Sequence, residues 1–195
     1  MTQTNMTSAR KAMIDSQLRT SGINEEYVLS RMNSVAREEF VPEGVKPLAY
    51  MDRAIPLGEG RFLPSPVVHG KMLSEAAPSP DDTVLVVENG ASYVAELIRP
   101  LVSSVETMSA KDAVGKSSGR KTYSLIIIDG AVEELSDTVK RHLGEGGRIV
   151  TGLVERGVTR LASGKKVAGA IALQPIAEIG IPVLDMFTKP ESWSF

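Results

Sequence analysis

The sequence predicts an α/β fold with a twisted, mainly parallel sheet flanked by helices, and three observations support it. Aliphatic runs alternate with helix-compatible runs through the second half of the chain. The run at 84–87 ends abruptly at Glu88-Asn89-Gly90, and a helix-compatible run follows from Tyr93. A strand, a tight turn and a helix form the first unit of a doubly wound sheet, whose ligand lies beyond the strand's carboxyl end. The length of 195 residues, 42% of them hydrophobic, suits one compact unit with a modest extension.

The first 78 residues are predicted to form a helical extension packed on the core. A weak apolar stripe predicts a helix over 7–19, which Gly22 ends. Asn24, followed by two glutamates, is expected to cap a second helix. The glycine-containing stretch 56–66 is expected to be a loop, and 69–76 a helix that is stopped by prolines.

Residues 79–195 are predicted to form the core of the same compact unit. The stretch 111–121, rich in Ser, Gly and Lys, is expected to be a flexible loop. The later segments 160–162, 167–174 and 179–185 are expected to be strands, with an antiparallel hairpin at the sheet edge. The expected parallel strands are 83–87, 102–106, 124–128 and 147–153, with helices at 92–100 and 133–142.

Composition excludes several classes of function. The net charge of -2 and the pI near 5.8 argue against nucleic acid as a partner. The chain has no cysteine and only two histidines, His69 and His142, so no metal site is expected. No apolar run reaches the length of about 18 residues that a membrane span needs, and no signal peptide is visible. We therefore expect a cytoplasmic protein that does not bind membranes, of undetermined oligomeric state.

Several segments, among them Arg37-Glu-Glu-Phe-Val-Pro42 and Ala49-Tyr50-Met-Asp52, follow one another in a known order and spacing. They resemble the protein-L-isoaspartate O-methyltransferase family. Further along the chain, Val84-Leu85, Gly90 and Tyr93 match its cofactor loop, and Gly146-Gly-Arg-Ile-Val matches a later strand. The matching segments in the first 75 residues are Met13-Ile-Asp-Ser-Gln-Leu-Arg, Gly22-Ile23, Val28-Leu29, Arg37-Glu-Glu-Phe-Val-Pro42, Ala49-Tyr50-Met-Asp52 and Pro56-Leu-Gly-Glu-Gly60, followed by Pro66 and Met72.

The resemblance implies a Rossmann-like methyltransferase with S-adenosylmethionine as cofactor. Its implied partner is a protein or peptide that bears an isoaspartyl residue, and the implied process is protein repair. The sequence departs from the family at the cofactor loop, where Glu-Ile-Gly-Thr-Gly-Ser-Gly-Tyr is replaced by Val86-Val-Glu-Asn-Gly-Ala-Ser-Tyr93. Between Glu106 and Tyr123 the chain is also shorter than the family by roughly a helix and a strand. We therefore expect a sheet that is shortened in the middle.

Four residues are predicted to bind the cofactor: Glu88, Gly90, Ser92 and Glu106. Glu106 would hold the two ribose hydroxyls, or would be a solvated glutamate at a strand end. Glu88 lies two residues after the position of the family's lost acid, on the same side of the strand. It would bind the cofactor's ammonium, or would be a plain turn residue. Ser92 would cap the following helix and narrow the site.

The substrate side is predicted from the segment Pro64-Ser65-Pro66, where the family has Ser-Gln-Pro. Ser65 is the candidate catalytic residue that orients the substrate; the alternative is a loop residue between two prolines. Asp52, Pro66 and Asp129 are the candidate substrate contacts. Asp52 would otherwise tie a loop together, and Asp129 would otherwise cap a helix.

Two main functions follow. In one, the protein is a methyltransferase that acts on isoaspartyl carboxylates with S-adenosylmethionine as methyl donor, and this activity is weak or has been lost. In the other it is an inactive homologue, a pseudoenzyme that binds proteins or peptides. A methyltransferase with a changed small-molecule substrate is a third hypothesis. The substitutions in the cofactor loop favour reduced activity, because they add side chains where the backbone should approach the ligand.

Overall fold

A six-stranded sheet forms the centre of the molecule in the computed structural model, which describes residues 3–116 and 119–188. The strand order is β4-β3-β5-β6-β7-β8. The strands are β3 (Thr83–Glu88), β4 (Ser104–Ser109), β5 (Tyr123–Val132), β6 (Leu143–Glu155), β7 (Val158–Val167) and β8 (Ala170–Glu178). The first four are parallel, and β7 and β8 continue the sheet as an antiparallel hairpin. The predicted fold class and the edge hairpin are confirmed.

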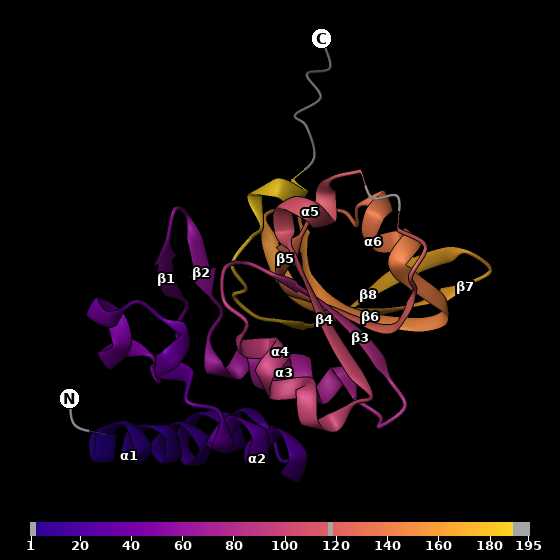
Figure 1. Cartoon of the computed structure of the whole chain (residues 1–195). Coiled ribbons are helices and arrows are strands. Elements are labelled where there is room, and N and C mark those ends of the chain that lie inside the picture. The colour runs from indigo at the N-terminus through magenta and orange to yellow at the C-terminus, as the bar shows by residue number, and fades with distance from the viewer. Residues whose placement is uncertain (1–2, 117–118, 189–195) are drawn as a thin grey trace.

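Helices cover both faces of the sheet (Figure 1). On one face lie α3 (Pro66–Ala76) and α4 (Tyr93–Ile98), which continues as the 3-10 turn Arg99–Leu101. On the other face lie α5 (Ala110–Val114) and α6 (Asp137–His142). Alternate residues of β3 enter different cores, since Val86 packs with α3 and α4 while Leu85 and Val87 pack with α5 and α6. Burial on both faces explains why the strand is apolar throughout.

The N-terminal segment packs beneath α3 and α4 (Figure 1). Its helices are α1 (Gln3–Met13) and α2 (Glu26–Ser34), with the π-helical turn Ile14–Leu18, the 3-10 turn Arg19–Ser21 and the later 3-10 turns Arg37–Phe40 and Glu43–Leu48. Met13 and Val28 belong to the same buried cluster as Val86 and Ile127 of the sheet. The N-terminal segment therefore shares the core of the sheet, and a boundary at residue 78 stays a prediction.

Four expectations about local structure are wrong. The segment 179–185 was expected to be a strand, but it forms only an isolated bridge between Val183 and Ala131. The predicted loop 56–66 contains the hairpin β1 (Ile55–Gly58) and β2 (Arg61–Leu63), because the positive φ angles of Gly58, Glu59 and Gly60 form a tight turn. The strand predicted at 102–106 runs instead from 104 to 109, in register with the whole of β3. Glu25, rather than Asn24, occupies the cap position of α2.

The chain passes from β4 to β5 through the short helix α5, and β4 lies at the edge of the sheet. The sheet is therefore shortened at this point, as the sequence predicted. The expected flexible loop 111–121 is helical over its first four residues, and 117–118 lie outside the described residues. Among the described helices, none has the length and apolar character needed to cross a membrane.

Candidate functional site

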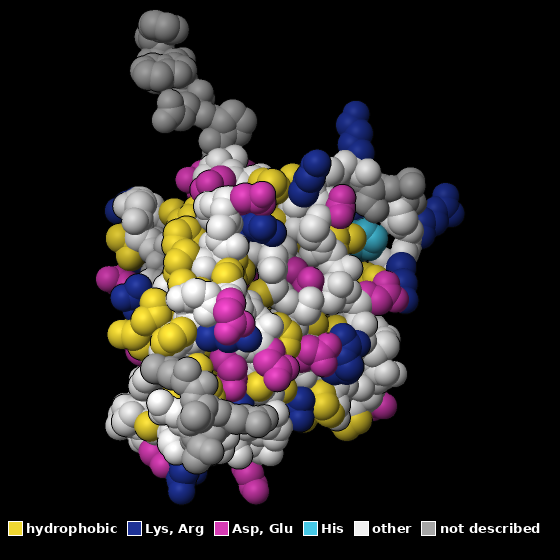
Figure 2. All heavy atoms as spheres, turned by 60° about the vertical axis from the view of Figure 1, so that its left-hand side comes forward, with side chains coloured by type: hydrophobic (Ala, Val, Ile, Leu, Met, Phe, Trp, Pro, Cys, Tyr) yellow, Lys and Arg dark blue, Asp and Glu magenta, His cyan; other side chains and the backbone are white. Residues whose placement is uncertain are grey.

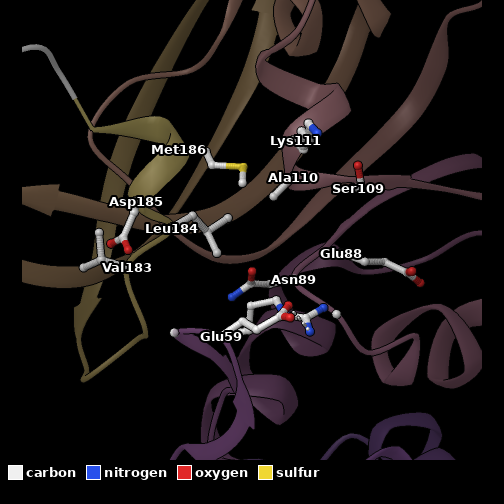
Figure 3. Close-up of a pocket in the computed structure, with 13 residues that line it drawn as sticks. Glu59, Glu88, Asn89, Ser109, Ala110, Lys111, Val183, Leu184, Asp185 and Met186 are labelled. Carbon is white, nitrogen blue, oxygen red and sulfur yellow. Dashed lines mark hydrogen bonds and ion pairs between the residues drawn. The ribbon is translucent and has the colours of Figure 1, made fainter.

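A cavity of about 450 Å³ opens at the carboxyl ends of β3 and β4. This is the edge at which doubly wound sheets bind ligands, and the volume is in the range of small-molecule sites. Four chain regions far apart in sequence surround it (Figure 3). The lining residues are Glu59, Gly60, Arg61, Glu88, Asn89, Gly90, Ser109, Ala110, Lys111, Val183, Leu184, Asp185 and Met186.

Gly90 lies in the turn after β3 and can be replaced by no other residue without strain. Its φ of 95° is in the left-handed region, which favours glycine. A Cβ atom at this position would lie 2.7 Å from Nη1 and 3.2 Å from Cδ of Arg61. The side chain of Arg61, from the hairpin β1–β2, therefore lies directly over the turn. A side chain at position 90 would therefore also meet the guanidinium of Arg61.

Glu88 is the last residue of β3 and is partly buried at the edge of the cavity. In Figure 3 its side chain extends away from Val183 and Asp185, on the other side of the cavity. Its Oε1 atom is buried and has no hydrogen-bond partner among the described residues. Burial raises the pKa of Glu88, the negative charge of Asp129 adds to the effect, and the hydroxyl of Ser92 opposes it. A partly buried carboxylate with a free oxygen is suited to a cationic or hydrogen-bond-donating ligand.

Asp129 instead belongs to a buried network outside the cavity lining. Its Oδ1 atom lies 2.8 Å from Nε2 of His69, and both side chains are almost fully buried. Nδ1 of His69 lies 2.8 Å from Nη1 of Arg37, which is completely buried. Because the guanidinium donates, Nδ1 accepts and Nε2 carries the proton that is donated to Asp129. Burial lowers the pKa of His69, which favours this neutral form.

Arg37 completes the network through backbone oxygens. Its Nε atom donates to the carbonyl of Ala49 at 2.8 Å, and Nη2 donates to the carbonyl of Pro64. The network thus joins the N-terminal segment, helix α3 and strand β5. The sequence gave no sign that Arg37 and His69 are joined to Asp129.

Ser65 and Pro66 begin helix α3. The hydroxyl of Ser65 accepts a hydrogen bond from the amide of Val68 at 3.5 Å, and Pro66 occupies the first helical turn. Both residues are buried, and neither lines the cavity. Asp52 is exposed and also lies outside the lining residues. The catalytic role of Ser65 and the substrate roles of Pro66, Asp52 and Asp129 stay predictions.

Glu106 lies in the middle of β4, paired in register with Leu85, and three residues before the strand ends. Its carboxylate accepts hydrogen bonds from Nζ of Lys121 and from the hydroxyl of Tyr123, the latter at 2.6 Å. Ser109, rather than Glu106, ends β4 and pairs with Glu88. Ser92 is exposed at the start of α4, where its side chain makes no capping bond. The cofactor roles of Glu106 and Ser92 also stay predictions.

The structure thus brings Glu88 and Gly90 together in the cavity and adds residues that the sequence did not indicate. Arg61 and Lys111 supply positive charge, while Glu59 and Asp185 supply further negative charge. Figure 2 shows basic and acidic side chains side by side on this face of the molecule. The arginine in the Pro-Leu-Gly-Glu-Gly-Arg segment was a visible signal, because an arginine directly after a glycine turn is placed to reach a neighbouring loop.

Known proteins with similar sequences share one description. The sequence profile of the "Protein-L-isoaspartate(D-aspartate) O-methyltransferase (PCMT)" family matches residues 8–114. A protein-L-isoaspartate O-methyltransferase of Herpetosiphon aurantiacus is 30% identical, over 72% of this chain and 74% of the relative. One of Methanoculleus marisnigri is 26% identical, over 91% of this chain and 92% of the relative. The Herpetosiphon alignment has 165 positions but covers only 72% of these 195 residues, so this chain lacks residues that the relative has.

A solved structure has a similar fold. It is a crystal structure described as a protein-L-isoaspartate O-methyltransferase of Plasmodium falciparum in complex with S-adenosyl-L-homocysteine. Its TM-score is 0.72 with 15% sequence identity, over 93% of this chain and 98% of that chain. The profile match covers more than half of the residues, and the Herpetosiphon relative is aligned over more than two thirds of both chains. The chain belongs to the protein-L-isoaspartate(D-aspartate) O-methyltransferase family.

Proposed function

We propose that this protein binds S-adenosylmethionine, the cofactor of its family, in the cavity beyond β3 and β4 and transfers its methyl group to isoaspartyl carboxylates of proteins or peptides. The observation that carries the proposal is the cavity itself. It lies at the ligand-binding edge of a methyltransferase-like sheet and is lined by Glu88 and Gly90, which stand at positions of the family's cofactor loop.

The residues present fit the amino-acid part of this cofactor. Gly90 brings the backbone close to the cavity without a side chain. Glu88 has a buried oxygen without a partner among the described residues, and the ammonium of the cofactor would satisfy it. Ser109, Ala110 and Lys111 form the wall on the side of β4, where the nucleoside would lie.

The protein's contribution to the reaction is position and exclusion of water. S-adenosylmethionine supplies a methyl group that its sulfonium already activates. A carboxylate nucleophile needs no general base, so the chain has to align the attacking oxygen and limit hydration. The hairpin residues 59–61 and the residues 183–186 border the cavity from two sides and would enclose the reacting groups.

A second function is supported by one observation. The guanidinium of Arg61 occupies the space above Gly90, since a Cβ atom there would lie 2.7 Å from its Nη1 atom. A protein with this arrangement would keep the fold as a protein- or peptide-binding module without methyl transfer.

Two measurements on the full chain separate these functions. We expect isothermal titration calorimetry to show binding of S-adenosyl-L-homocysteine with a Kd in the micromolar range, which corresponds to about -8 kcal/mol. We also expect transfer of a labelled methyl group to an isoaspartyl peptide, and no transfer to the same peptide with a normal aspartyl residue.

Each outcome has a defined meaning. Cofactor binding without transfer to the isoaspartyl peptide would support the binding module. Absence of heat at millimolar S-adenosyl-L-homocysteine would refute the proposed cofactor site.

A further inference from the structure

Arg61 is a cation of the cavity whose hydrogen bonds are only partly satisfied. Its Nε atom is buried and has no hydrogen-bond partner among the described residues. Its Nη2 atom bonds to Oε2 of Glu59 at 3.0 Å. The side chain of Glu59 is 84% exposed, and an ion pair of this kind contributes little. A guanidinium has five N–H donors, so Arg61 keeps donors that its bond to Glu59 does not use.

The position of Arg61 places its N–H donors beside the turn that follows β3. The Cδ and Nη1 atoms lie against Gly90, and the residue lines the same cavity as Glu88. Lys111 lies on the opposite wall, with Ala110 and Ser109 (Figure 3). The cavity therefore presents a planar cation beside the turn and, at its edge, a carboxylate with one oxygen that has no partner among the described residues.

We infer that Arg61 binds a carboxylate group of the ligand in this cavity and displaces Glu59 when it does so. An arginine fork matches the two oxygens of a carboxylate, and such charge-assisted bonds are about twice as strong as neutral ones. A ligand that carries a carboxylate and an ammonium would satisfy both Arg61 and Glu88. The inference rests on the proposed function, which supplies two ligands with a carboxylate: the methyl donor and the isoaspartyl peptide.

The test compares ligands with and without a carboxylate. S-adenosyl-L-homocysteine and 5′-methylthioadenosine share the nucleoside, but only the first carries the amino-acid group. We expect Arg61→Ala to weaken binding of S-adenosyl-L-homocysteine at least tenfold in calorimetry, and to leave binding of methylthioadenosine unchanged. Arg61→Lys should restore only part of the affinity, since an ammonium lacks the planar fork.

Glu59→Gln is the matched control, because it removes the competing acceptor and keeps the side-chain shape. We expect it to tighten binding of S-adenosyl-L-homocysteine, while weaker binding would count against displacement of Glu59. Thermal denaturation of each variant shows whether the fold is kept.

A second arm identifies the source of the carboxylate. If Arg61→Ala leaves S-adenosyl-L-homocysteine unaffected but weakens an isoaspartyl peptide tenfold in its presence, Arg61 binds the substrate's carboxylate. Equal weakening of S-adenosyl-L-homocysteine and methylthioadenosine would show a structural role and overturn the inference, as would no change for any ligand. If the wild-type protein binds none of these ligands, the proposed function fails first, and the inference fails with it.

Discussion

Two clusters of charged residues lie close to β3 and β5, and they differ in how completely their hydrogen bonds are satisfied. In the buried network, Arg37, His69 and Asp129 are bonded to one another and to backbone oxygens. In the cavity, Glu88 and Arg61 each have a buried polar atom without a partner among the described residues. Buried polar groups in proteins are nearly always satisfied. The first cluster therefore has the character of a structural element, and the second that of a binding site.

The difference corrects a simple interpretation of the sequence. Asp129 and Glu88 both follow or end an apolar strand run, and each was a candidate ligand contact. The structure gives Asp129 a histidine partner and leaves an oxygen of Glu88 without one. A carboxylate that follows or ends an apolar run therefore indicates a ligand contact only when its hydrogen-bond partners are known. Carboxylate-to-amide substitutions at three positions test the comparison.

Asp129→Asn is expected to have the largest effect. It keeps an oxygen that can accept from His69 but removes the negative charge, which leaves Arg37 as an uncompensated buried cation. Removal of one partner from a buried charge pair lowers the free energy of unfolding by about 3–5 kcal/mol. For this variant we expect a loss of stability near the lower value. Urea denaturation followed by circular dichroism measures it. A loss below about 0.5 kcal/mol, typical of surface substitutions, would contradict a structural role.

Glu88→Gln is expected to lower the affinity for the ligand rather than the stability of the fold. The pKa of Glu88 is raised, so the folded state favours the protonated carboxyl. The stability that protonation of Glu88 contributes is present at low pH and is lost as pH rises through that pKa. The amide removes this pH-dependent loss, and the melting temperature should stay or rise slightly. Affinity for S-adenosyl-L-homocysteine should fall about tenfold at neutral pH, with loss of a charge-assisted hydrogen bond.

The pH dependence sharpens this prediction. Wild-type affinity should decrease as pH falls through the raised pKa of Glu88, because a protonated carboxyl no longer attracts the ammonium. The Gln variant should show a flat and weaker profile in the same calorimetric series. Parallel profiles for the two proteins would exclude Glu88 from ligand binding.

Ser65→Ala separates a helix cap from a catalytic role. Loss of the hydroxyl that accepts from Val68 should destabilise the protein by about 1 kcal/mol. Affinity for S-adenosyl-L-homocysteine should not change, because Ser65 does not line the cavity. If methyl transfer to an isoaspartyl peptide is lost while stability is unchanged, the predicted catalytic role is favoured instead.

Glu106→Gln is expected to have the smallest effect. The side chain is 48% exposed and is already bonded to Lys121 and Tyr123. We expect the affinity for S-adenosyl-L-homocysteine to change less than twofold. A tenfold loss, with the melting temperature unchanged, would support the predicted contact with the ribose hydroxyls.

The sequence by itself determined the order and type of the core elements. The apolar run before Glu88, the turn at Gly90 and the helix from Tyr93 are local patterns, since periodicity and turn chemistry act over a few residues. The family could also be recognised from the sequence, because its segments keep their order. The shortening after Glu106 followed from the same comparison and agrees with the edge position of β4.

Only the tertiary structure decided which side chains are satisfied. The bond between His69 and Asp129 joins positions 60 residues apart, and the contact of Arg61 with Gly90 depends on how a hairpin packs over a distant turn. The register of β4 against β3 moved Glu106 away from the strand end. Such contacts depend on packing between distant segments, which local propensity does not encode. The candidate site could therefore be located from the sequence, but its chemistry required the fold.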